Sequence, residues 1–192
     1  MRKLANSIGT VDKLERALLS CLNEKEYCDV TISAISKRAG INRTTFYLFF
    51  GSKDELFVHM CGSLIDQWFQ RFFDLNITRN VVSEKEQYYQ LLTWIRQWRP
   101  ALKQIPGIKT DSFDGFSLLR EEIELKMSAQ KPFQTEDKGK RKKYDLFIKV
   151  YSFGVVSILK WMLDEEDDFD AAEFHSMLQG LRYKGFYSIL DY

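Results

Sequence analysis

A short stretch around residue 45 carries side chains that can both read and hold DNA. Arg43 can form two hydrogen bonds with the edge of a guanine, and Thr44 can contact a thymine methyl group or exchange a hydrogen bond with a base. Hydrogen-bond donors suited to phosphate surround this pair, at Thr31, Thr45, Tyr47 and Lys53. Together these residue types predict recognition of double-stranded DNA.

Two short helices must position these side chains if they are to act together. A threonine is a good N-cap for a helix over about 31–39, and Gly40 supplies the left-handed turn that ends it. Asn42 can cap a second helix that runs to about residue 50. This layout is that of a helix-turn-helix, in which side chains near the start of the second helix reach base edges.

Three phenylalanines give the second helix an apolar side. Phe46, Phe49 and Phe50 lie within five residues. A helix this short is not stable alone in water, so we expect these rings to pack against the helices before and after it.

Positive charge is concentrated on the same two helices. Four basic residues and no acidic one lie between Asp29 and Asp54: Lys37, Arg38, Arg43 and Lys53. The helix N-termini near residues 31, 43 and 53 also favour anions. On spacing alone the alternative stays open that this is a solvated amphipathic helix pair with a few basic residues.

The rest of the chain predicts an all-α protein of about nine helices. Hydrophobic residues make up 45% of the sequence, which is enough for a substantial core, and strand-like alternation is nearly absent. Ser52 and Glu55 form a capping box for a long fourth helix, and Pro100 is expected to kink or end a later one. Other helices are expected from about Thr10 to 22 and over about 83–98, 118–127, 140–164 and 170–190. We divide the chain into a helix-turn-helix domain, 1–52, and a helical bundle, 53–192.

The order of residues in this region resembles a known family. The segment TISAISKRAGINRTTFYLFFGSKDELF, residues 31–57, is similar to the DNA-binding segment of the TetR family of transcriptional regulators. The likeness runs from about Thr10 to Leu56, with the turn glycine, the Phe-Tyr pair and the Ser-Lys helix start all in register. It implies a sequence-specific, DNA-binding transcriptional regulator.

The resemblance implies a role for each matching residue. Base-reading positions match Ser33, Arg43 and Thr44, and phosphate-contacting positions match Thr31, Tyr47 and Lys53. Leu48 and Phe49 depart from the family pattern, which often has polar or basic residues there, and neither can hydrogen-bond a phosphate. This departure implies fewer backbone contacts, or compensation by Arg2 and Lys3 in an N-terminal arm.

The resemblance also implies a homodimer formed through the last two long helices, on a palindromic operator. Five residues suit close contact between helices across such an interface: Ser152, Val155, Ile158, Leu181 and Gly185. The alternative is that they form ordinary core stripes within one chain. The segment YSFGVVSILKWML, residues 151–163, is similar to regulators grouped near the dihydroxyacetone-kinase activators.

Many members of the family bind an inducer in the bundle, and the aromatic residues here suit a small hydrophobic or cationic ligand. The candidate lining residues are Trp68, Trp94, Trp98, Phe113, Phe147 and Tyr151. Aromatic residues at helical spacing are also the usual content of a core. Two charge runs, Lys138–Lys143 and Asp164–Asp170, are expected to be solvated.

Nothing in the sequence predicts an enzyme, a metal site or a cofactor. The histidines, His59 and His175, lie far apart, and no nucleophile elbow, phosphate loop or zinc spacing occurs. Three cysteines without CxxC spacing suggest reduced thiols. No signal peptide or membrane span is expected, which favours the cytoplasm.

Two functions of different class follow. In the first, the protein is a repressor that releases its operator when an inducer binds the bundle. In the second, a protein partner controls the bundle, and the protein acts as a regulator or co-activator without a small ligand. A closed cavity with polar anchors would favour the first, and exposed apolar surface outside the dimer contact would favour the second.

Overall fold

The computed structural model describes residues 2–70, 84–130 and 134–165. Within these ranges the regular elements are seven α-helices and two short 3-10 helices, and no strand is present. The all-α prediction is confirmed. About nine helices are predicted from the sequence, and the one expected over about 170–190 lies outside the described residues.

The first helix, α1, is longer than its apolar pattern predicts. It spans Arg2–Leu22, so Thr10 lies inside it and is not its cap. The residues before Thr10 include Arg, Lys, Leu and Ala, which favour helix even without an apolar stripe. Arg2 and Lys3 therefore belong to a helix and not to an extended arm. The apolar side of α1 packs into the core, where Leu14, Leu18 and Leu22 are fully buried.

Helices α2 (Ile32–Ala39) and α3 (Arg43–Tyr47) follow a short 3-10 helix, η1 (Tyr27–Asp29). Thr31 caps α2 by accepting the Ala34 N–H at 3.1 Å, and Asn42 caps α3 by accepting the Thr45 N–H at 2.7 Å. Gly40 ends α2 in the left-handed region, with φ 69°. Helix α3 ends at Tyr47, about three residues earlier than predicted.

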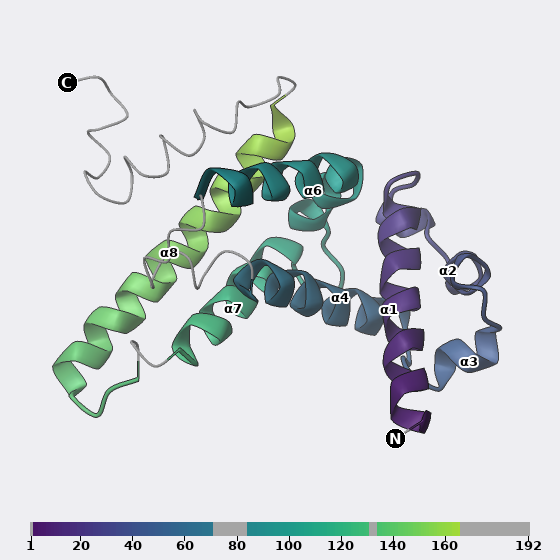
Figure 1. The fold of residues 1–192 in the computed structure, drawn as a ribbon, viewed down its shortest axis with the longest axis horizontal. Helices are drawn as coiled ribbons and strands as arrows, with labels where there is room; N and C mark the ends of the chain where they lie inside the picture. The colour runs from purple at the N-terminus through teal and green to yellow at the C-terminus, as the bar shows by residue number, and fades with distance from the viewer. Residues whose placement is uncertain (1, 71–83, 131–133, 166–192) are drawn as a thin grey trace.

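Helix α4 (Lys53–Trp68) connects α3 to the later helices. It packs against α1 on one side and against α7 (Gly115–Ser128) on the other (Figure 1). The predicted capping box is present, because Ser52 Oγ accepts the Glu55 N–H and Glu55 Oε2 accepts the Gly51 N–H. Leu56, Phe57 and Met60 form the buried side of this helix.

Pro100 lies inside a continuous helix, and the N–H of the next residue, Ala101, has a hydrogen-bond partner. Helix α6 spans Glu84–Gln104 and continues through the proline, contrary to one form of the prediction. Proline disturbs the hydrogen bonds of its own turn. The N–H of Ala101 is donated to Asn23 Oδ1 at 3.0 Å, just beyond the end of α1. A contact from another part of the chain thus supports the helix at this point.

Gly115 begins α7 at a very close approach of two backbones. A short 3-10 helix, η3 (Ile105–Gly107), lies beneath it. A Cβ added at Gly115 would lie 1.9 Å from the Ile105 carbonyl oxygen, so only glycine fits. The Gly115 N–H donates to the Ile108 carbonyl at 2.8 Å, which fixes the loop between η3 and α7.

Helix α8 (Lys138–Asp164) covers α7 and also contacts α6 (Figure 1). By length and composition it is the one described helix that could span a membrane, with a mean hydropathy of 1.6 over its most apolar window. Only 28% of that window is buried, although Ile148, Val156 and Leu163 pack against the rest of the chain.

Candidate nucleic-acid interface

The α2–α3 pair stands on a buried aromatic platform. Phe46 is fully buried and Phe50 nearly so, while Phe49 is partly buried against the same core. The Phe46 ring lies 6.1 Å from that of Phe50 and packs edge-on against Tyr47. The prediction that the phenylalanines form the packing side of α3 is confirmed. The opposite side of this short helix is therefore held in a fixed orientation.

The predicted DNA-contacting residues lie mostly on that opposite side. Four of them are exposed: Thr31, Ser33, Arg43 and Thr44. Tyr47 is 49% exposed, although its ring also rests on Phe46. Together these side chains form one polar surface from the start of α2 to the end of α3.

Thr31 and Thr45 differ in whether their hydroxyl hydrogen is free to bond a phosphate. Thr31 Oγ1 accepts a hydrogen bond, so its hydroxyl hydrogen is left for a phosphate oxygen. Thr45 is half-buried, and its Oγ1 donates to Asn42 Oδ1 at 3.0 Å. As it stands, Thr45 supports the cap of α3 and has no second hydrogen to donate.

Lys53 forms hydrogen bonds with the segment that connects α1 and α2. Its Nζ donates to the carbonyl oxygens of Tyr27, at 2.6 Å, and Val30, at 2.9 Å. The same ammonium lies 4.1 Å from the centre of the Tyr27 ring. Burial lowers the pKa of Lys53, against the opposing effect of Asp54. One ammonium hydrogen remains for a phosphate, so Lys53 ties α4 to η1 in addition to its expected role.

Arg38 is not part of the free positive charge of this surface. Its guanidinium donates to Glu24 Oε2 at 2.6 Å and to Ser20 Oγ at 3.2 Å, which ties α2 to the end of α1. The Glu24 carboxylate raises the pKa of Arg38 further. Of the four basic residues that concentrate here in the sequence, Lys37 and Arg43 are exposed and have no ion-pair partner among the described residues.

Comparison with known proteins identifies the domain. Residues 16–60 match the sequence profile described as "Bacterial regulatory proteins, tetR family". Within these residues the chain is similar to the DNA-binding domain of the TetR family, and we call this segment the TetR-type domain. A relative from Bacillus subtilis (strain 168), the uncharacterized HTH-type transcriptional regulator YxbF, is 38% identical over 64 residues. That alignment covers 31% of this chain and 17% of YxbF, so the likeness concerns this TetR-type domain alone.

One solved structure extends the likeness to most of the chain at the level of the fold. The TetR family repressor AlkX from Dietzia sp. strain DQ12-45-1b, implicated in biodegradation of n-alkanes, aligns over 90% of this chain and 94% of its own. Its TM-score is 0.52 and its identity 16%, which supports a shared fold only. The dihydroxyacetone kinase operon activator DhaS covers 90% of this chain and 93% of its own, with a TM-score of 0.48 and 16% identity.

Sequence reasoning missed the residues that attach the TetR-type domain to the bundle. Gln104, the last residue of α6, donates through Nε2 to the carbonyls of Leu22, at 2.7 Å, and Lys25, at 3.0 Å, and accepts the Tyr27 N–H at 3.1 Å. The Tyr27 hydroxyl donates to Asp54 Oδ1 at 2.5 Å. Burial and this carboxylate raise the Tyr27 pKa far above its usual value, so the hydroxyl stays a donor.

The six aromatic residues predicted to line a pocket lie in different surroundings in the described part of the chain. Phe113 stacks on Phe57 at 4.7 Å, and both Phe113 and the three tryptophans of α4 and α6 are partly buried against the core. Phe147 is exposed and stacks on Tyr151 on α8. An open groove of about 790 Å³ lies instead beside the TetR-type domain. Its lining contains none of the six predicted residues: Leu22, Asn23, Glu24, Lys25, Glu26, Asp29, Pro100, Lys103 and Gln104.

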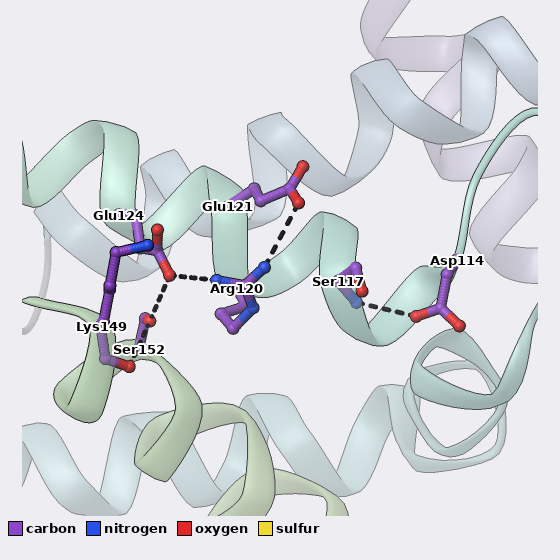
Figure 2. A network of polar contacts seen from close by, with 7 residues as sticks. All are labelled: Asp114, Ser117, Arg120, Glu121, Glu124, Lys149 and Ser152. Carbon is purple, nitrogen blue, oxygen red and sulfur yellow. Dashed lines mark hydrogen bonds and ion pairs between the residues drawn. The ribbon is translucent and has the colours of Figure 1, made fainter.

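The predicted dimer residues on α8 face the chain's own core. Ser152 is fully buried, and its Oγ lies 3.0 Å from both Glu124 Oε1 and the Lys149 carbonyl oxygen. Figure 2 shows the Glu124 carboxylate between Ser152 and Arg120, which also pairs with Glu121. Val155 and Ile158 are partly buried against the same core. Leu181 and Gly185 lie outside the described residues.

His59 has a structural partner. Its Nδ1 lies 2.7 Å from Glu15 Oε1, and the same oxygen accepts the Ser63 hydroxyl at 2.6 Å. His59 and Ser63 therefore both hold α4 against α1 through Glu15, and they are not bonded to each other. Within the described ranges, no group of three His, Cys, Asp or Glu side chains could hold a metal ion.

Proposed function

We propose that the protein is a sequence-specific, DNA-binding transcriptional regulator that acts as a homodimer. The observation that carries the proposal is the polar surface of Thr31, Ser33, Arg43, Thr44 and Tyr47 on the buried platform of Phe46 and Phe50. A rigid short helix with an exposed arginine and threonine near its start is what reading of the major groove requires. The match to the TetR family supports the same conclusion.

In this proposal the two halves of the surface have different tasks. Arg43 reads a guanine through two hydrogen bonds, and Thr44 contacts a neighbouring base. The Thr31 hydroxyl, the Tyr47 hydroxyl and the remaining hydrogen of Lys53 hold phosphates and set the register. Because Thr31 and Lys53 belong to well-anchored segments, this register is fixed before DNA binds.

Replacing Arg43 with alanine tests base reading. The protein is first used to select its preferred sites from random double-stranded DNA, and dissociation constants are then measured across a salt series. We expect Arg43→Ala to weaken binding to the selected site by roughly 1–3 kcal/mol, or about 5- to 150-fold, and to relax the preference for one base pair.

Arg141→Ala is the matched control, because it removes the same side chain and charge from the far end of α8, distant from α3 in Figure 1. It should leave site preference unchanged. Equal weakening by both variants, or a native protein whose binding is weak and abolished by salt, would contradict the proposal.

The exposed face of α8 supports the homodimer, on residues other than those predicted. Leu146, Val150 and Phe153 are all exposed at helical spacing, and Val150 is 66% exposed. Gly154 lies beside Phe153, and a Cβ there would meet nothing within 4 Å. This stripe is apolar and lies away from the buried Ser152, and the Phe153 ring also packs edge-on against Phe116 of α7. A second copy of the same helix is the occupant that we propose for it.

The charges at the ends of α8 favour an antiparallel arrangement. Basic residues occupy the start of the helix and Asp164 its end, which is opposite to what the helix dipole prefers. Within the chain, Asp164 also pairs with Lys160 and Lys103. Lys143 and Asp164 are equally distant from the midpoint between Phe153 and Gly154. A two-fold axis at that midpoint would bring the basic start of one α8 to the acidic end of the other. Phe153 would then lie opposite the glycine of the second copy.

A charged residue in the stripe tests this interface. We expect Val150→Glu to convert the protein from dimer to monomer, measured by sedimentation equilibrium, and to weaken binding to a two-half-site operator at least tenfold. The reason is that a carboxylate would be buried among apolar side chains. Leu125→Glu, at an exposed position on α7, is the control and should remain dimeric. A dimeric Val150→Glu variant would overturn this arrangement and leave the stripe for a different protein partner.

Control by a small molecule is the second layer of the proposal. The groove beside Gln104 and Asn23 lies where α6 is bonded to the end of α1, so a ligand there would act directly on the attachment of the TetR-type domain. Its lining carries the carboxylates of Glu24, Glu26 and Asp29 and the ammonium groups of Lys25 and Lys103. Glu24 already pairs with Arg38, so the charge of the groove is nearly balanced and selects no single ligand class. The measurement is the operator affinity with and without candidate hydrophobic and cationic compounds. If none changes it, control by a protein partner becomes the better account.

A further inference from the structure

Leu48 is the most exposed of the large hydrophobic residues in the described part of the chain, at 77%. A single exposed leucine is ordinary on a protein surface. This one directly follows Tyr47 at the end of the recognition helix, on the surface that we assign to DNA. A polar side chain would be the simpler choice there, because it could also bond a phosphate.

The backbone of Leu48 is held in a helical conformation, which fixes the direction of its exposed side chain. Its N–H donates to the Thr45 carbonyl at 3.2 Å, and its φ and ψ of −75° and −19° continue the helix. Phe46 and Phe50, two residues before and after it, are buried in the core. The helix therefore turns Leu48 away from the platform and toward solvent.

Leu48 lies on the same side of the helix as Thr44. Residues four apart in a helix are neighbours on one face, and Thr44 is exposed as well. Thr44 contributes a methyl group and Leu48 an isobutyl group, so this side of α3 is partly apolar. The two side chains are separated by about one helical turn of 5.4 Å, which corresponds to one or two base-pair steps of about 3.4 Å.

The thymine C5-methyl is the apolar group that base edges offer in the major groove. We propose that Leu48, together with Thr44, reads thymine methyl groups next to the base pair contacted by Arg43. This inference rests on the proposed function and deepens it. In this arrangement position 48 makes no phosphate contact and contributes a preference for thymine at one or two neighbouring positions.

Deoxyuridine substitution tests the contact, because it removes the methyl group and leaves the base pair otherwise unchanged. Each thymine of the selected site is replaced in turn, and dissociation constants are measured by fluorescence anisotropy for the native protein and for Leu48→Ala. We expect one or two substitutions to weaken native binding about three- to fivefold, the size expected for one buried methyl group. Leu48→Ala should lose this sensitivity at one of those positions.

Two measurements separate the failure of this inference from that of the proposed function. Leu48→Ala should keep its thermal stability and its preference for the guanine read by Arg43, since the side chain is exposed. If native binding is selective but the two proteins respond alike to every deoxyuridine, the Leu48 contact is overturned and DNA recognition stands. If no selective site is recovered at all, both fall.

Discussion

Replacing Phe46 with alanine should lower the free energy of unfolding by about 3–5 kcal/mol, because a fully buried aromatic ring is removed from the core. The expected functional effect is larger still. Helix α3 has only five residues and depends on packing for its helical state, so operator binding should be lost under conditions in which α4 and the bundle remain folded. Urea denaturation followed by circular dichroism, together with DNA titration, measures both effects.

Phe46→Leu is the control for this substitution. It keeps most of the buried volume, so we expect a cost below about 1.5 kcal/mol and near-native DNA binding. An alanine variant with an unchanged denaturation midpoint would show that the ring does not support the recognition helix. Retention of binding by a destabilised alanine variant would show that α3 forms on the DNA without its platform.

Replacing Gly115 with alanine is expected to destabilise the protein by about 3 kcal/mol or more, at or above the upper end of ordinary overpacking. The added Cβ would lie 1.9 Å from the Ile105 carbonyl oxygen and 3.2 Å from that of Ile108. Both are backbone atoms, so no side chain can move aside, and η3 would have to separate from α7. The measurement is the midpoint of urea denaturation.

Gly9→Ala is the matched control. Gly9 lies inside α1, and a Cβ there would meet nothing within 4 Å. In a helix interior alanine is favoured over glycine by about 0.5–1 kcal/mol, so this variant should be as stable as the native protein or more so. If Gly115→Ala and Gly9→Ala have the same midpoint of urea denaturation, the close approach of η3 to Gly115 is contradicted.

The parts of the fold that were predicted correctly are those that short stretches of sequence determine. Thr31, Asn42 and Ser52 each cap the helix that follows, and Gly40 adopts the expected left-handed conformation. A cap bonds to an N–H two or three residues away, so its partner is visible in the sequence. The recognition helix could be located for the same reason, and the match over residues 16–60 agrees.

Features that depend on distant partners could not be predicted in this way. Pro100 signals a helix end by itself, but Asn23, nearly eighty residues earlier, accepts the N–H of Ala101 and lets α6 continue. The two faces of α8 are both apolar, so periodicity could not show that Ser152 points inward and Val150 outward. The predicted aromatic residues were assigned to a pocket, although Phe113 stacks on Phe57 and is partly buried against the core.

Lys53 has two roles, a predicted phosphate contact and a structural attachment, and the sequence pattern indicates only the first. The family resemblance explains its position by a phosphate, while the structure adds bonds to Tyr27 and Val30 that hold α4 to η1. A variant at this position would therefore change both the DNA contact and the attachment of α4. Arg43 is the cleaner residue for testing recognition, since it is exposed and has no partner of this kind among the described residues.

The bonds of Gln104 and Asn23 limit how far this protein can be treated as a set of interchangeable modules. The carbonyls at the end of α1 are satisfied by an amide that belongs to the bundle, and α6 is in turn supported by an amide from the end of α1. Grafting residues 1–52 onto the bundle of another regulator would leave both sets of groups without partners. A chimera that transfers this DNA specificity must therefore carry the last turn of α6 along with the recognition helix.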